Sequence, residues 1–279
     1  MVKFGMHITG FDIVNYFARN FDNILLGRYW GADVLGLYSR AYGIMMLPII
    51  QVRNPLNAVA IPALSHLQND PIRFRKYCIK LISLIAFITM PLVAFLFVCA
   101  DQAIYLLLGN QWIGAVTIFK ILCINAFVQP VLGTTGLVLI SLGQSKRYLI
   151  IGILNSIVIV ISFVLGLRWG AIGVAVGYTI AIYILFIPTL RLSFKWTPIS
   201  IIDFLSALLR PLIASLIMGL LILSLRPYLA DLSVIISIGC SCLIGFLIYL
   251  ISLICLPGGL LLLRELVSYR NFLFQKKSV

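Results

Sequence analysis

Polar and charged side chains interrupt an apolar run near the N-terminus. The run extends from about Phe4 to Tyr29 and is otherwise apolar enough to cross a membrane. It carries Asp12, Asn15, Arg19, Asn20, Asp22 and Asn23. A charge at the bilayer centre costs at least a few kcal/mol unless it faces protein or water. Residues of these types can therefore line a water-filled path for a polar substrate, or they can lock neighbouring helices together.

The spacing of these residues places five of them on one side of a helix. At 100° per residue, all except Asn20 fall within an arc of roughly 100°, and apolar residues fill the rest of the helix surface. The stripe is about 15 Å long, and Arg19 lies one turn from both Asn15 and Asp22, within reach of a hydrogen bond or ion pair. Five polar groups exceed what one helix lock needs, which favours a lined path, but a structural Arg19–Asp22 pair stays open.

The composition indicates the elements that must position this stripe. The chain has 279 residues, of which 62% are hydrophobic and only 10% are charged. Soluble domains are closer to half apolar and a quarter charged. The apolar runs extend along the whole chain, so a signal peptide or a single anchor does not explain them. We predict an all-α integral membrane protein.

The apolar runs and the turn signals between them predict about eight transmembrane helices. A span needs about 20 residues. The expected spans are 4–26, 34–62, 79–100, 114–142, 148–167, 171–190, 207–225 and 232–256. The runs are too long and too uniformly apolar for the alternating strands of a barrel.

The positive charge predicts an orientation. The net charge is +13, and most Lys and Arg residues lie between apolar runs. Alternate connections place fourteen cations on one side and three on the other. Since cytoplasmic loops carry the excess of Lys and Arg, we expect both termini in the cytoplasm. Arg19, Arg40, Arg53 and Lys120 remain within apolar runs. Arg40 and Lys120 can reach a water interface on their long stems or can line the same cavity as the stripe.

Several other functions fit the sequence poorly. The cations lie where membrane loops would be, so we do not expect nucleic-acid binding. The six cysteines and two histidines show no metal-ligand or disulfide pattern, so no metal or cofactor is expected. The eight carboxylates show no pair suited to acid–base work, so we do not expect an enzyme.

Four stretches in order resemble a known family. They are RNFDNILLGRYWGADVLGLYSRAYGIMMLP, IPALSHLQNDPIRFRKY, LLGNQW and the segment around TTGLVLISLGQSKR. They resemble the polysaccharide flippases of the multidrug/oligosaccharidyl-lipid/polysaccharide (MOP) exporter superfamily, over about residues 1–200. Members of that family have two six-helix lobes that face each other across a cavity, sometimes followed by two extra helices. The resemblance implies a second lobe at 1–192, two extra helices at 193–260 and a basic cytoplasmic tail at 261–279.

The resemblance also implies a function and candidate residues. It implies translocation of a polyprenyl-diphosphate-linked oligosaccharide across the plasma (inner) membrane for surface polysaccharide synthesis. The matching motifs imply a substrate site at Arg19, Asn20, Asp22, Arg40 and Tyr42, and family members are thought to couple to ions, for which Asp12 or Asp22 are the candidates here. From the residues themselves we add Asn15 and Lys120 as cavity candidates.

Three alternatives stay open within this interpretation. The chain can work with a separate N-terminal lobe or with polysaccharide assembly proteins, because a lone lobe has no facing wall. It can instead be a non-transporting fragment or assembly subunit. A drug exporter of the same superfamily would favour negative charge in its cavity, whereas the charges within the apolar runs are mostly positive.

Overall fold

The computed structural model describes residues 2–229 and 231–260, and within them it confirms the all-α prediction. These residues form nine α-helices and three short 3-10 turns, with no strand among them. A helix satisfies its backbone hydrogen bonds internally, as a bilayer requires. The helices are α1 (Val2–His66), α2 (Pro71–Val98), α3 (Ala100–Leu108), α4 (Ala115–Ala126), α5 (Gln129–Ser141), α6 (Ser145–Gly166), α7 (Gly170–Phe194), α8 (Ile201–Leu225) and α9 (Val234–Cys255).

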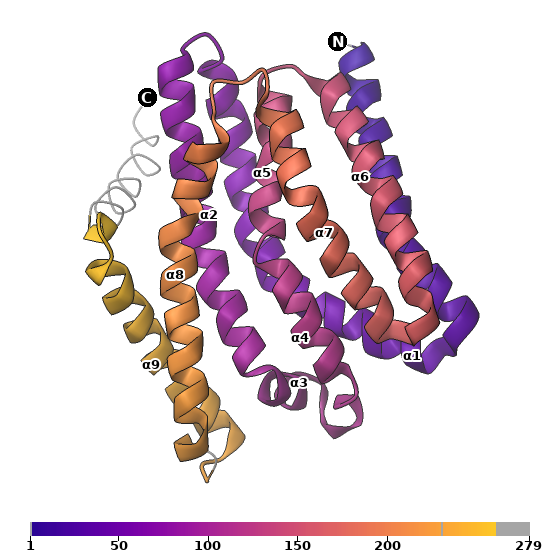
Figure 1. The fold of residues 1–279 in the computed structure, drawn as a ribbon, viewed down its shortest axis with the longest axis vertical. Coiled ribbons are helices and arrows are strands. Elements are labelled where there is room, and N and C mark those ends of the chain that lie inside the picture. The colour runs from indigo at the N-terminus through magenta and orange to yellow at the C-terminus, as the bar shows by residue number, and fades with distance from the viewer. Residues whose placement is uncertain (1, 230, 261–279) are drawn as a thin grey trace.

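Helix α1 contains the first two predicted spans. It is broken only at Gly31, where φ is 84° and ψ is 178°. Residues other than glycine rarely adopt this backbone conformation, so the glycine at position 31 permits the change of direction. In Figure 1 the chain runs down from the N-terminus, turns, and rises again to the turn before α2. The predicted loop between residues 26 and 34 is therefore wrong, because a single residue makes the break.

The predicted span 114–142 is a bent pair of helices. α4 ends at Ala126, α5 begins at Gln129, and the two axes differ by 41°. Pro130 explains the bend, since its ring has no N–H to donate and clashes with the carbonyl group four residues earlier, at Ala126. The prediction of one continuous helix is wrong at this point.

The number of spans depends on how the bent segments are counted. By length and composition, five helical segments of the described chain can cross a membrane, or six if α4 and α5 together form one span. Two of the five, Val2–His66 and Ser145–Phe194, contain a break or turn and are longer than one crossing of about 30 Å needs at 1.5 Å per residue. The count of eight stays a prediction.

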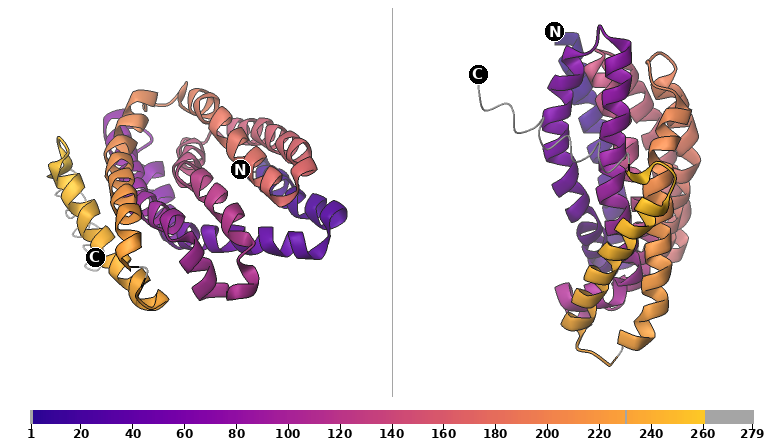
Figure 2. Two further views of the ribbon diagram at one scale, coloured as in Figure 1. Left: turned by 60° about the horizontal axis from the view of Figure 1, so that its bottom comes forward. Right: turned by 90° about the vertical axis from the view of Figure 1, so that its left-hand side faces the viewer.

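The helices form a bundle in which α6 and α9 lie at opposite edges (Figure 1, Figure 2). α8 packs along α2, and α9 packs on the outer side of α8. Arg75 of α2 makes a bidentate ion pair with Asp203 of α8, at 2.7 and 2.8 Å. Tyr249 of α9 donates a hydrogen bond to the carbonyl of Phe87. The basic tail predicted at 261–279 lies outside the described residues.

Candidate functional site: a polar cavity between α1, α5, α6 and α7

A cavity of about 290 Å³ lies between both segments of α1 and helices α5, α6 and α7. Its walls combine apolar side chains with two arginines and several amides and hydroxyls. In a bundle of apolar helices, polar groups that face an internal space can be solvated there, whereas they would be costly against lipid. This cavity is therefore where the polar residues of the sequence can do chemistry.

The predicted stripe on α1 reaches the cavity through two of its members. Asn15 and Arg19 line it, and both side chains are half-buried. Arg19 also donates a hydrogen bond of 2.7 Å to the hydroxyl of Tyr42 on the second segment of α1. Arg19 is thus held in place by Tyr42 while it faces the cavity.

Asp22 lies elsewhere. Its side chain is only 3% exposed, and it accepts hydrogen bonds from the Tyr38 hydroxyl and the Asn23 backbone N–H, each at 2.7 Å. Asp22 is not among the residues that line the cavity. The structure places Asp22 in a contact between the two segments of α1, which is the helix-locking geometry, and places Arg19 at the cavity.

The remaining candidates lie outside the cavity lining. Asp12 and Arg40 are exposed, and the Arg40 guanidinium carbon is 5.8 Å from the centroid of the Trp112 ring. Asn20 donates a hydrogen bond to the carbonyl of Tyr16 on its own helix. Lys120 is half-buried on α4. Burial raises the pKa of Asp101, but the hydrogen bond and charge of Arg226, with a smaller contribution from Lys120, hold that pKa below its usual value. Tyr42 supports Arg19 from outside the lining.

Arg53 and Asn57 form a second polar wall that we did not assign to the site from the sequence. They lie one turn apart on the second segment of α1, and both line the cavity. A Cβ atom added to Gly133 would be 3.2 Å from Nη1 of Arg53, so the guanidinium packs closely against α5. The Nε atom of Arg53 and the Oδ1 atom of Asn57 are buried and have no hydrogen-bond partner within the described chain. Two polar residues at i and i+4 inside an apolar run are the sequence signal that could have indicated this pair.

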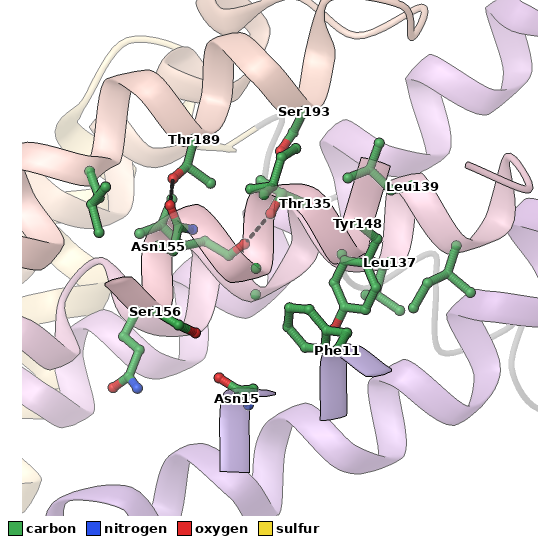
Figure 3. Close-up of a pocket in the computed structure, with 18 of the residues that line it drawn as sticks. Phe11, Asn15, Thr135, Leu137, Leu139, Tyr148, Asn155, Ser156, Thr189 and Ser193 are labelled. Atoms are coloured by element: carbon green, nitrogen blue, oxygen red, sulfur yellow. Dashed lines mark hydrogen bonds between the residues drawn. The ribbon is translucent and has the colours of Figure 1, made fainter. Parts of the chain in front are cut away.

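Helices α6 and α7 add neutral polar groups to the cavity. Thr189 donates a hydrogen bond of 3.1 Å to Oδ1 of Asn155, and Ser156 of α6 and Ser193 of α7 also line the cavity (Figure 3). Gln129 of α5 donates a hydrogen bond of 3.2 Å to the hydroxyl of Tyr178, while its Oε1 has no partner among the described residues. Amides and hydroxyls of this kind can exchange hydrogen bonds with sugar hydroxyls or water.

Stacked aromatic rings bound the cavity on the side toward the N-terminus of α1. The rings of Phe11 and Tyr148 lie with centroids 3.8 Å apart (Figure 3). Gly152 makes room for this stack, because a Cβ atom there would overlap the ring of Phe11. Asn15 lies one turn beyond Phe11 on α1 and is the first polar residue of α1 in the cavity lining.

The charge balance of the cavity follows from its lining. Arg19 and Arg53 are its charged residues, and no carboxylate lines it within residues 2–229 and 231–260. In those same ranges, no three His, Cys, Asp or Glu side chains gather as a metal site would need. The cavity is therefore suited to an anion that also offers hydrogen-bonding groups.

Comparison with other sequences agrees with the resemblance found from the motifs. Residues 1–117 match the family described as "Polysaccharide biosynthesis protein". The chain is 26% identical over 178 residues to the lipopolysaccharide biosynthesis protein WzxC of Escherichia coli (strain K12), which covers 63% of this chain and 36% of that protein. It is 28% identical over 143 residues to the teichuronic acid biosynthesis protein TuaB of Bacillus subtilis (strain 168), which covers 51% of this chain and 30% of that protein.

A longer match extends along most of the chain. An uncharacterized membrane protein in the cps region of Klebsiella pneumoniae is 25% identical over 262 residues, which is 92% of this chain and 53% of that protein. The chain thus spans between about a third and a half of the length of these three relatives.

Solved structures show the same fold. The lipid II flippase MurJ in an inward closed conformation superposes with a TM-score of 0.70 and 21% identity, over 94% of this chain and 52% of that one. An outward-facing multidrug resistance MATE transporter of the MOP superfamily superposes with a TM-score of 0.62 and 14% identity, over 90% and 62% of the two chains. The chain therefore has the fold of these membrane transporters, in agreement with the resemblance found from the motifs.

Proposed function

We propose that this chain forms one wall of a flippase that moves a polyprenyl-diphosphate-linked oligosaccharide across the plasma membrane for surface polysaccharide synthesis. The observation that carries the proposal is a single cavity lined by Arg19 and Arg53, by amides and hydroxyls, and by no carboxylate among the described residues. The names of the relatives, which concern lipopolysaccharide and teichuronic acid biosynthesis, support the polysaccharide context.

The two arginines suit the diphosphate. A guanidinium offers several N–H donors in a plane and binds phosphate oxygens in pairs. The buried Nε of Arg53 has no partner within the described chain, so it remains available to an anion that enters the cavity. We therefore assign the diphosphate contact to Arg19 and Arg53 rather than to Arg40, whose side chain is exposed beside Trp112.

The neutral polar wall suits the sugars. Asn155, Thr189 and Ser193 on α6 and α7 present hydrogen-bonding groups to the same cavity. The apolar lipid can stay in the bilayer while the head group crosses, so the protein needs to solvate the head group alone. A second lobe, in the same protein or in a separate chain, supplies the facing wall in this proposal, and both termini of this chain lie in the cytoplasm.

The experiment compares export after charge-neutral replacements in the native host. We expect Arg19→Gln and Arg53→Gln each to lower surface polysaccharide at least about tenfold, because a lost charge-assisted hydrogen bond is worth roughly 1.5–3 kcal/mol. Lipid-linked oligosaccharide should accumulate in the inner leaflet, and the amount of protein in the membrane should stay constant. Arg40→Gln is the matched control, since it removes the same side chain outside the cavity.

The same experiment tests the alternatives. Normal export by the Arg19→Gln/Arg53→Gln double variant would contradict the proposal. A drug exporter would lose resistance to a cationic compound without losing polysaccharide, but two arginines without a described carboxylate make this cavity unfavourable for a cation. An assembly subunit would lower polysaccharide without accumulation of the lipid-linked oligosaccharide.

A further inference from the structure

A second pocket lies at the end of the bundle that contains the N-terminus of α1. We name it the basic end pocket, and its lining includes Lys3, His7, Ser145, Lys146, Arg147 and Trp196. These residues come from the start of α1, the start of α6 and the segment after α7. The Phe11–Tyr148 stack, one turn further along α1 and α6, lines the polar cavity and not this pocket. The basic end pocket is therefore separate from the cavity proposed for transport.

The pocket gathers positive charge without a described counterion. Lys3, Lys146 and Arg147 line it, and among the residues described no ion pair joins any of them to a carboxylate. Arg147 instead donates to the side-chain oxygen of Gln144, at 2.8 Å. Three cations that surround one pocket repel each other, so an anion in the pocket would be stabilised by all three.

The start of α6 adds to this field. Lys146 and Arg147 lie in the first turn of α6, which is 22 residues long, and the side chain of its N-cap residue Gln144 makes no cap hydrogen bond. A helix N-terminus carries a partial positive charge and favours phosphate groups. His7 and Ser145, which both line the pocket, form a hydrogen bond of 3.1 Å that joins α1 to α6.

The aromatic side of the pocket indicates where it lies relative to the bilayer. Trp196 is 63% exposed. The guanidinium carbon of Arg147 lies 5.2 Å from the centroid of the Trp196 ring, and the ammonium nitrogen of Lys195 lies 5.5 Å from it. Tryptophan beside cations is typical of the level of the lipid head groups. The next turns of α6 expose Ile150, Ile153 and Leu154, which an acyl chain can cover.

We propose that the basic end pocket binds the phosphate of an anionic phospholipid head group, with Lys3, Lys146 and Arg147 around the phosphate and the acyl chains along α6. Basic pockets between transmembrane helices on the cytoplasmic side are suited to such head groups. The exposed apolar side chains Ile150, Ile153 and Leu154 follow the pocket along α6, which favours a lipid over a soluble phosphate. This proposal does not depend on transport by the polar cavity.

The test measures lipid retention by the purified full chain in detergent, with native mass spectrometry as the readout. We expect dioleoylphosphatidylglycerol to be retained at a concentration about tenfold lower than dioleoylphosphatidylcholine. The variant Lys3→Gln/Lys146→Gln should remove most of this preference, since each cation near a lipid surface is worth about 1 kcal/mol. Both side chains are exposed, and Lys3→Arg/Lys146→Arg should restore the preference.

The matched control removes the same charge elsewhere. Arg73→Gln/Lys76→Gln deletes two exposed cations from the start of α2, at the same end of the bundle in Figure 1. We expect this variant to retain the preference within about twofold, because neither residue lines the pocket. Equal losses in the two variants would overturn the proposal in favour of general attraction to negative lipid. Displacement of the lipid by millimolar inorganic phosphate would overturn it in favour of a soluble anion, and equal retention of the two lipids would overturn it outright.

Discussion

The hydroxyl of Tyr38 donates a hydrogen bond of 2.7 Å to Oδ2 of Asp22, across the break of α1 at Gly31. One turn away from each of these residues, Arg19 donates to Tyr42. Two polar contacts therefore join the descending and ascending segments of α1, and one of them also holds an arginine at the cavity. The polar stripe thus contains both a structural lock and a cavity-lining cation.

We expect Tyr38→Phe to destabilise the protein. The substitution removes one of two donors from a carboxylate that is 3% exposed, and an unsatisfied buried group costs about 1–3 kcal/mol. The measurement is the midpoint of thermal unfolding of the purified protein in detergent, followed by intrinsic tryptophan fluorescence. Tyr228→Phe is the matched control, because Tyr228 is 82% exposed. Equal midpoints for the two variants would contradict the role of the Tyr38–Asp22 contact.

Gly31→Ala should also destabilise the fold, for a different reason. A Cβ atom at Gly31 would meet no described atom within 4 Å, so the cost comes from the backbone at φ +84° rather than from a clash. Strain of this kind costs about 1–3 kcal/mol. Gly43→Ala separates the two effects, since Gly43 also has no described atom within 4 Å of an added Cβ and is not among the glycines with positive φ. If both substitutions left the unfolding midpoint unchanged, the break at Gly31 would not need glycine.

The sequence predicts the helices well because helix formation in a bilayer depends mainly on the hydropathy of each segment. Long apolar runs must be helical in a bilayer, and the all-α architecture follows from composition and length. The boundaries were less accurate where one residue decides them. Gly31 ends a segment without a loop, and Pro130 bends a span that is apolar on both sides. Neither change of direction alters the hydropathy on which the prediction rests.

The site was only partly predictable for a related reason. The angular spacing on one helix grouped Asn15 with Arg19, and both line the cavity, but the spacing could not show which members of a stripe face a partner segment and which face a cavity. Asp22 meets Tyr38 only because the chain reverses at Gly31. Arg53 and Asn57 reach the cavity through the same reversal, which brings residues from either end of α1 together. Such contacts depend on tertiary packing, which periodicity along one helix does not contain.

Gly173→Ala should separate helices α6 and α7. A Cβ atom at Gly173 would overlap the carbonyl oxygen of Gly166, which is part of the backbone and cannot move away alone. Small residues at a membrane helix contact allow this close approach, and overpacking costs about 1–3 kcal/mol. The loss of thermal stability should exceed that of Gly239→Ala, where an added Cβ meets no described atom within 4 Å. An unchanged midpoint for Gly173→Ala would show that the two helices do not pack this closely.

The ion pair between Asp101 and Arg226 should make stability depend on pH. Arg226 at the end of α8 binds the Asp101 carboxylate and, at 2.9 Å, the carbonyl of Val98, so it joins α8 to the start of α3. Burial alone raises the pKa of Asp101, but the hydrogen bond and charge of Arg226 outweigh it, and the pKa lies below its usual value. The unfolded chain therefore takes up this proton first as the pH falls, and the stabilisation is present above about pH 4 and is lost below it.

The Asp101 side chain is 47% exposed, so the effect is about 0.2–1 kcal/mol. We expect Asp101→Asn to lower the unfolding midpoint at pH 7 and to flatten its decline between about pH 5 and pH 3. Asp33→Asn, which removes an exposed carboxylate, should leave the wild-type slope, and the same slope in Asp101→Asn would contradict the assignment.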